Sequence, residues 1–198
     1  MPKIVDINEK KKMISENALE VFNRKGYYNT NMDDIAKACN IGRATLYDYF
    51  KNKEAIFLYT MESFFDALDK DIYEVNNISR IGNIDKIKYI FKIVFDTYME
   101  LQPMSLMIYD TWVILYRDNP KLISSTKMRM HRYRELLSSI LMQGIEKKEI
   151  RELNPVSMGA TLLCLVDSLI FALQITKAND DINLYIKDVD LILDGLRY

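Results

Sequence analysis

The stretch that decides the fold covers residues 30–50 and reads TNMDDIAKACNIGRATLYDYF. Its apolar spacing predicts a short helix over 32–39 and a second over 43–50. Between them lies a turn at 40–42, where Asn40 is one of the few residue types besides glycine that tolerate a positive φ. The residues that face inward from the two helices are Ile35, Ala36, Cys39, Leu46 and Phe50. The pattern predicts a helix-turn-helix, roughly 32–50, whose second helix enters the major groove of DNA.

The outward side chains of the second helix combine groups that read bases with groups that bind phosphates. Arg43 can donate two hydrogen bonds to guanine, and the methyl groups of Ala44 and Thr45 can contact the thymine methyl. Tyrosine and threonine hydroxyls can reach phosphates. Asp48 can accept a hydrogen bond from cytosine, although its charge repels the DNA backbone.

A longer pattern around this stretch resembles the N-terminal signature of the TetR family of transcriptional regulators. The family shows a Gly-aromatic pair, then Ile-Ala, then Thr-Leu-Tyr-x-x-Phe-x-x-Lys. Here these are Gly26-Tyr27, Ile35-Ala36 and the run 45–53. The resemblance covers about residues 10–58. It implies a DNA-binding head on a helical effector and dimerisation body, with operator DNA and a small-molecule effector as partners.

The resemblance also implies roles for single residues. It assigns phosphate contacts to Thr30, to the tyrosine hydroxyls of the second helix and to Lys53, and base contacts to Arg43 and Thr45. Gly42 stands where the family often has Ser as N-cap, so the cap of the second helix is expected to be weaker. The predicted DNA-binding residues are Thr30, Arg43, Ala44, Thr45, Tyr47, Asp48, Tyr49 and Lys53.

Helical apolar spacing continues almost throughout the chain, which predicts an all-α protein of about nine helices. Asn-Pro pairs and single Asn residues mark expected helix starts, Asn83 among them as an N-cap. The expected helices are 8–25, 32–39, 43–50, 53 to about 75, 83 to before Pro103, about 104–117, 120 to about 148, 155 to about 177, and about 182–197. Two domains are expected: a helix-turn-helix domain over 1–52, and a ligand-binding and dimerisation domain over 53–198.

The 198 residues are 49% hydrophobic and carry a formal net charge of −1. Residues 1–53 hold ten Lys/Arg and seven Asp/Glu, so they carry +3 and the remainder −4. This asymmetry fits a small DNA-binding module on an acidic body. The longest apolar run, 162–173, contains Asp167 and Ser168 and is expected to be too short to span a bilayer. The absence of a signal-peptide core predicts a cytoplasmic location, with Cys39 and Cys164 buried as small apolar residues.

A helix that is apolar all round, as 162–173 predicts, must be buried on two sides. The last helix offers a second apolar face. A two-fold homodimer through roughly 154–197 would bury both, and a monomer with a larger core is the alternative. The apolar residues of the last helix are Ile182, Ile186, Val189, Leu193 and Leu196.

The middle helices are rich in Met and aromatic residues, which suit an adaptable apolar pocket for a small apolar or aromatic effector. The same residues also make ordinary cores, and that alternative stays open for each of them. Asp167 could neutralise a lipophilic cation or lie at a rim or interface. The candidate ligand residues are Phe65, Phe95, Tyr98, Met99, Met107, Tyr109, Trp112, Tyr116 and Asp167.

Three function classes compete. A ligand-responsive regulator, most simply a repressor released from a palindromic operator, agrees with every pattern above. An enzyme is not expected, because one histidine, two isolated cysteines and the lack of a glycine-rich phosphate loop predict no catalytic site, no metal site and no cofactor. A helical regulator without an inducer, or a protein-binding adaptor, remains the alternative, although an adaptor has no need for exposed Arg, Thr and Tyr at groove-reading positions.

Overall fold

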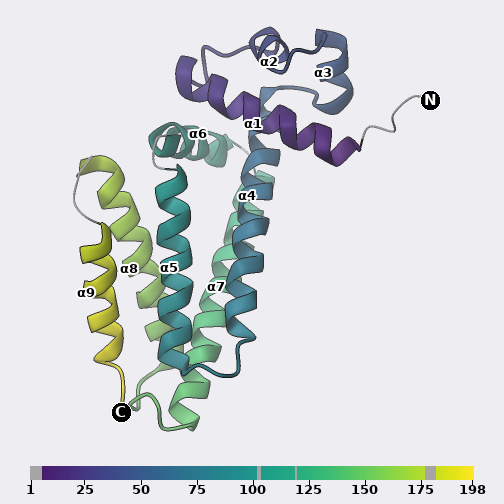
Figure 1. Ribbon diagram of the computed structural model, residues 1–198. Coiled ribbons are helices and arrows are strands. Elements are labelled where there is room, and N and C mark those ends of the chain that lie inside the picture. The colour runs from purple at the N-terminus through teal and green to yellow at the C-terminus, as the bar shows by residue number, and fades with distance from the viewer. Residues whose placement is uncertain (1–5, 102–103, 119, 177–181) are drawn as a thin grey trace. The chain divides into compact units, whose positions relative to one another are not determined.

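The computed structural model describes residues 6–101, 104–118, 120–176 and 182–198, and these ranges hold nine α-helices (Figure 1). The predicted all-α class is confirmed, and helix bounds differ from the expected ones by a few residues. The helices are α1 (Ile7–Lys25), α2 (Met32–Ala38), α3 (Arg43–Tyr49), α4 (Lys53–Asn76), α5 (Asn83–Leu101), α6 (Ser105–Asp118), α7 (Pro120–Glu146), α8 (Pro155–Thr176) and α9 (Ile182–Asp194).

Packing divides the chain into two compact units, a head up to Ala67 and a body from Leu68 onward. The division falls inside α4, whereas the sequence suggested a boundary at the start of that helix. The reason is that the first half of α4 belongs to the core of the head, where Ile56, Phe57 and Met61 are buried. One continuous helix therefore contributes to both cores.

The core of the head forms around α1. Its N-cap is Asp6, whose side chain accepts a hydrogen bond from the Asn8 amide at 2.9 Å. Phe22 is fully buried, with its ring centroid 5.1 Å from that of Tyr27 and 6.4 Å from that of Phe57. The helix ends at Gly26, where φ is 79°. Glycine adopts this positive φ without steric cost, and the ψ of 147° lies outside the left-handed helical region.

The body core lies among α5, α7, α8 and α9, which run side by side in Figure 1. The expected start of α8 is confirmed, because the Asn154 side chain accepts hydrogen bonds from the amides of Val156 and Ser157 at 3.0 and 3.1 Å. The core is aliphatic with two phenylalanines. Its central residues are Ile84, Ile87, Phe91, Phe95, Leu137, Ile140, Leu141, Leu162, Val166, Val189 and Leu193.

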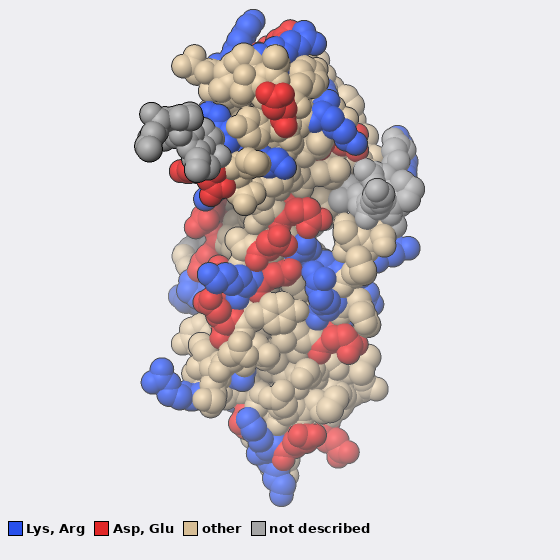
Figure 2. All heavy atoms as spheres, turned by 90° about the vertical axis from the view of Figure 1, so that its right-hand side faces the viewer, with Lys and Arg blue, Asp and Glu red and all other residues tan. Residues whose placement is uncertain are grey.

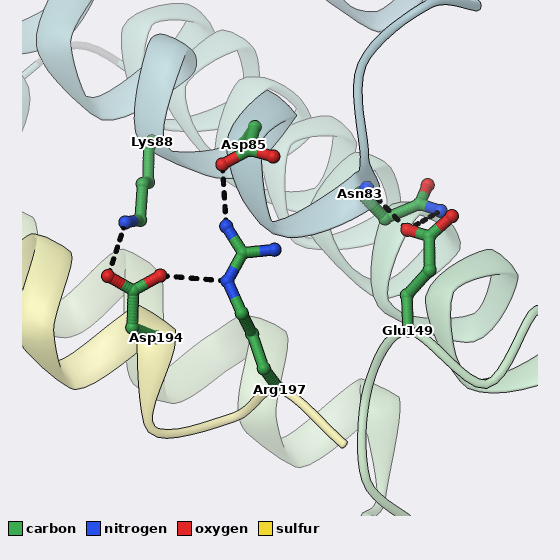
Figure 3. Close-up of polar contacts among 6 residues, drawn as sticks. All are labelled: Asn83, Asp85, Lys88, Glu149, Asp194 and Arg197. Atoms are coloured by element: carbon green, nitrogen blue, oxygen red, sulfur yellow. Dashed lines mark hydrogen bonds and ion pairs between the residues drawn. The ribbon is translucent and has the colours of Figure 1, made fainter.

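The start of α5 differs from expectation. Asn83 was predicted to be the N-cap, and this is wrong: the Lys86 amide donates to the Gly82 carbonyl at 3.0 Å, so the helix begins one residue earlier than that prediction requires. Asn83 is instead fully buried. Its backbone and side-chain amides donate to Glu149 Oε2 at 2.7 and 2.9 Å (Figure 3). Sequence reasoning missed this partner because Glu149 lies in the connection after α7, 66 residues away.

A second polar cluster ties the end of the chain to α5. Arg197 Nη2 lies 2.6 Å from Asp85 Oδ1, and its Nε lies 2.8 Å from Asp194 Oδ1 (Figure 3). Asp194 also accepts from Lys88 Nζ at 2.7 Å. These contacts hold the segment after α9 against the first turns of α5.

Little of α8 is buried although the helix is strongly apolar. By length and composition Pro155–Leu173 could cross a membrane, and only 22% of it is buried within the chain. The sequence-based statement that this region is too short was wrong, because the apolar stretch extends back from Leu162 to Pro155. Cys164 is exposed on this helix, contrary to expectation, whereas Cys39 is buried as expected.

Glu149→Gln tests the anchor at the start of α5. We expect the free energy of unfolding near pH 7 to fall by on the order of 1 kcal/mol, because a charge-assisted acceptor is lost. The amides of Asn83 lower the pKa of the Glu149 carboxyl from 4.5. The difference in unfolding free energy between the variant and the wild type should therefore have its full size above pH 4.5. It should vanish as the pH falls through the lowered pKa of Glu149. Glu152→Gln, at an exposed neighbouring position, is the control in denaturant titrations; a difference that is constant with pH would contradict the role of the Glu149 charge.

Candidate DNA interface

The first helix of the motif starts at a complete capping box. The Asn31 side chain accepts from the Asp34 amide at 3.0 Å, and Asp34 accepts from the Asn31 amide at 3.1 Å. Asp34 also pairs with Lys25 Nζ at 2.7 Å. The lysine and the Asn31 amide lower the pKa of the Asp34 carboxyl. The end of α1 and the start of α2 are thereby fixed to each other.

The turn between α2 and α3 has the conformation that the sequence predicts. Asn40 adopts a φ of 51°, and the Ile41 amide donates to the Ala36 carbonyl at 3.0 Å. Gly42 is the N-cap of α3 and makes no side-chain cap hydrogen bond, as expected of a glycine. Leu46 is completely buried and anchors α3 from beneath. With its inner face fixed in this way, α3 presents its other face to solvent.

The outer face of α3 carries the residues predicted to contact DNA. Tyr49 is half-buried, and the other five are exposed: Arg43, Ala44, Thr45, Tyr47 and Asp48. The net charge of the chain is −1, and on the face drawn in Figure 2 acidic and basic side chains are interspersed. An attraction for DNA must therefore come from local groups around α3 and not from the net charge.

Arg43 has two partners within the head. Its Nη1 lies 3.2 Å from Asp33 Oδ2, and its guanidinium lies 5.7 Å from the centre of the Tyr47 ring. Both members of the ion pair are largely exposed, with side-chain exposures of 63% and 48%. Such a pair contributes little stability, so a guanine base can displace Asp33 at small cost. Sequence reasoning missed Asp33, which is ten residues from Arg43 and on a different helix.

Two of the predicted phosphate contacts point into the head instead. Thr30 is 2% exposed, and its hydroxyl donates to the Gly26 carbonyl at 2.8 Å. Lys53 Nζ donates to the carbonyls of Tyr27, Tyr28 and Thr30 at 2.7, 3.0 and 2.8 Å. Burial lowers the pKa of this lysine. An ammonium group has three donors, and here three backbone carbonyls accept from it.

The predicted ligand residues are spread over both units. Phe95 belongs to the body core, Tyr98 is buried, and Met99 is exposed. Tyr109 is exposed and packs on Phe171 with 5.2 Å between ring centroids. Of the rest, Phe65 lies in the head unit. Half-buried on α6 are Met107, Trp112 and Tyr116. Asp167 is exposed on α8, and desolvation by the surrounding protein raises the pKa of its carboxyl.

A cavity of about 510 Å³ lies between the start of α5 and α9, and none of the predicted ligand residues lines it. Its walls carry Arg80, Tyr89, Lys92, Ile186 and Asp190. Sequence reasoning missed it because α5 and α9 come together only in the folded body. The mixed charges of this cavity do not match the apolar pocket that was expected.

Comparison with known proteins finds a family match for part of the head. Residues 14–60 match the profile of the bacterial regulatory proteins of the tetR family. The biofilm operon icaADBC HTH-type negative transcriptional regulator IcaR of Staphylococcus aureus is 36% identical over 86 residues, which are 43% of this chain and 46% of that protein. The chain thus matches less than half the length of this relative.

Solved structures extend the likeness to the whole chain. A regulator from Clostridium perfringens, described as acting in fatty acid metabolism, is 25% identical, with 93% of this chain and 98% of that chain covered and a TM-score of 0.71. The transcriptional regulator FadR of Bacillus subtilis, solved in complex with stearoyl-CoA, is 21% identical, with coverages of 92% and 96% and a TM-score of 0.71. The second likeness concerns the fold alone.

Arg43→Ala tests base reading by α3. We expect a loss on the order of 1–3 kcal/mol in binding free energy at particular base pairs and a smaller loss on other sequences, because a bidentate contact to guanine is removed. The measurement is a set of equilibrium titrations on duplexes that differ by single base pairs. Lys37→Ala, an exposed charge on α2, is the matched control and should weaken all duplexes alike. An equal loss for Arg43→Ala on every duplex would rule out base reading by this residue.

Proposed function

We propose that this chain is a member of the TetR family and a cytoplasmic homodimeric repressor that leaves a palindromic operator when a small apolar or aromatic effector binds its body. The observation that carries the proposal is the exposed outer face of α3 above the buried Leu46. An adaptor would have no use for Arg43, Thr45 and Tyr47 in this arrangement. These groups match the donors, methyls and hydroxyls that read bases and hold phosphates.

A homodimer is supported by apolar surface on the last two helices. Large apolar side chains remain exposed along α8 and α9 although α8 is apolar on nearly all sides. Large apolar side chains left exposed on neighbouring helices are typical of an interface. A second copy, related by a two-fold axis, would cover it with an identical surface. The exposed side chains are Val156, Phe171, Leu184, Leu191 and Ile192, at 63%, 40%, 56%, 69% and 51%.

Sedimentation at micromolar concentration tests this assembly. We expect a dimer, with recognition helices about 34–36 Å apart or able to reach that spacing on two half-sites. Leu191→Asp should shift the chain toward monomer because it places a charge in the interface. Met142→Asp, at an exposed apolar position on α7, should leave the dimer intact. A wild-type monomer, or a chain that stays in solution only with detergent, would contradict the homodimer.

The effector proposal rests on the half-buried wall of α6 and on the relative that was solved with stearoyl-CoA. Met107, Trp112 and Tyr116 offer adaptable apolar surface. Met107 Sδ already accepts a hydrogen bond from Thr111 at 3.7 Å, so its side chain is ordered by its own helix. An acyl-chained or aromatic molecule is the ligand class that such a wall accommodates.

Coupling between effector and DNA requires a path along α4, the covalent link between the two units. In the body this helix is held by buried Ile72 and by Asp69. Asp69 Oδ2 lies 2.7 Å from Arg129 Nη1, and its Oδ1 accepts from the Tyr133 hydroxyl at 2.5 Å. Both partners lie on α7 and Arg129 is buried. A ligand that displaces α7 would therefore move the body half of α4, which is a rigid-body change between two states.

Titration of stearoyl-CoA with and without saturating DNA tests this coupling. We expect the two affinities to differ, and a tenfold difference corresponds to about 1.4 kcal/mol of coupling free energy that must act equally in both directions. Asp69→Asn should reduce the difference, because α7 then holds α4 less firmly. Asp71→Asn, at an exposed position on the same helix, is the control. Equal affinities in the wild-type titrations would contradict coupling between this ligand and DNA.

A further inference from the structure

The connection between α1 and α2 is a short turn whose conformation decides where the helix-turn-helix begins. The Thr30 amide donates to the Tyr27 carbonyl at 3.3 Å and closes the turn. The next residue, Asn31, is already the N-cap of α2. Any change in the direction of this turn therefore changes the direction of α2, and with it α3.

Lys53 reaches this turn from the start of α4. Its ammonium group has no donor left for another acceptor, because it donates to the carbonyls of Tyr27, Tyr28 and Thr30, all within 3.0 Å. The same nitrogen lies 4.7 Å from the centre of the Tyr27 ring, a distance at which a cation is attracted to the ring face. Three carbonyls and one aromatic face enclose the charge on the side away from solvent.

We propose that Lys53 is a positioning residue for DNA binding: it holds the turn over residues 27–30 so that α2 and α3 are already in place before DNA arrives. This inference rests on the proposed function. It departs from the phosphate contact that the family resemblance implies for Lys53. To reach a phosphate, the ammonium group would have to give up its hydrogen bonds to three carbonyls. The Tyr27 carbonyl would keep the Thr30 amide as a donor, and the carbonyls of Tyr28 and Thr30 would lose their donor from Lys53.

Holding the turn and binding a phosphate place different demands on the shape of the cation. Three convergent carbonyls suit a compact ammonium group, whereas a guanidinium is planar and presents its donors as a fork. Arginine binds phosphate at least as well as lysine does. Lys53→Arg therefore preserves a phosphate contact and disrupts the carbonyl site, while Lys53→Met removes the charge and keeps much of the side-chain length.

The test uses the full chain and a duplex that the wild-type protein selects from a random-sequence pool. We expect Lys53→Met and Lys53→Arg each to lose affinity on the order of tenfold, which corresponds to about 1.4 kcal/mol. The slope of log K against log salt should stay at the wild-type value for both. Lys51→Met, at an exposed position two residues away, is the matched control for removal of a head charge.

Hydrogen exchange keeps the test decisive if a variant binds too weakly to measure. We expect the amides of Thr30 and of the first turn of α2 to exchange faster in both Lys53 variants, with slow exchange retained in the body. Two results would overturn the proposal: unchanged exchange at these amides, or a salt slope reduced by roughly 0.9 in Lys53→Met together with full affinity in Lys53→Arg. Failure of the wild-type protein to select any duplex would instead overturn DNA binding itself.

Discussion

A half-buried ammonium group must exchange its water for other hydrogen-bond acceptors, and Lys53 finds three in the backbone of one turn. The arrangement joins the start of α4 to the residues that precede α2. Thr30 adds a fourth tie through its hydroxyl to Gly26, and the pair of Lys25 with Asp34 adds another. The position of α3 depends on these contacts, since α3 follows α2 after a turn of fixed geometry.

The helix α4 makes polar contacts of a different kind in each unit. At its first turn α4 carries Lys53, whose ammonium group donates to the backbone carbonyls of the turn before α2. In the body it carries Asp69, which accepts from Arg129 and Tyr133 on α7. The helix α4 is therefore anchored by polar contacts in each unit. Breaking a buried ion pair by removing one partner is costly, so the pair of Asp69 with Arg129 opposes local melting of the body half of the helix.

The parts of this structure that sequence could predict are those set by local rules. Helix positions followed from apolar spacing, the turn at Asn40 from its tolerance of positive φ, and the start of α8 from Asn154. Several missed features depend on contacts between different elements: Glu149 with the start of α5, Asp33 with Arg43, and the cavity between α5 and α9. The exposed α8 surface was anticipated because an apolar helix needs burial on every side, and a single chain supplies too little.

On this account Lys53, at the start of α4, holds the helix-turn-helix in place and does not itself contact DNA. Nitrogen-15 spectra of the Lys53 ammonium group, recorded for the free protein and for the protein on its selected duplex, test this most directly. The account predicts an ammonium signal that is protected from solvent exchange without DNA and keeps its shift on binding. A signal that appears only with DNA, and that shows scalar coupling to a backbone phosphorus, would contradict it.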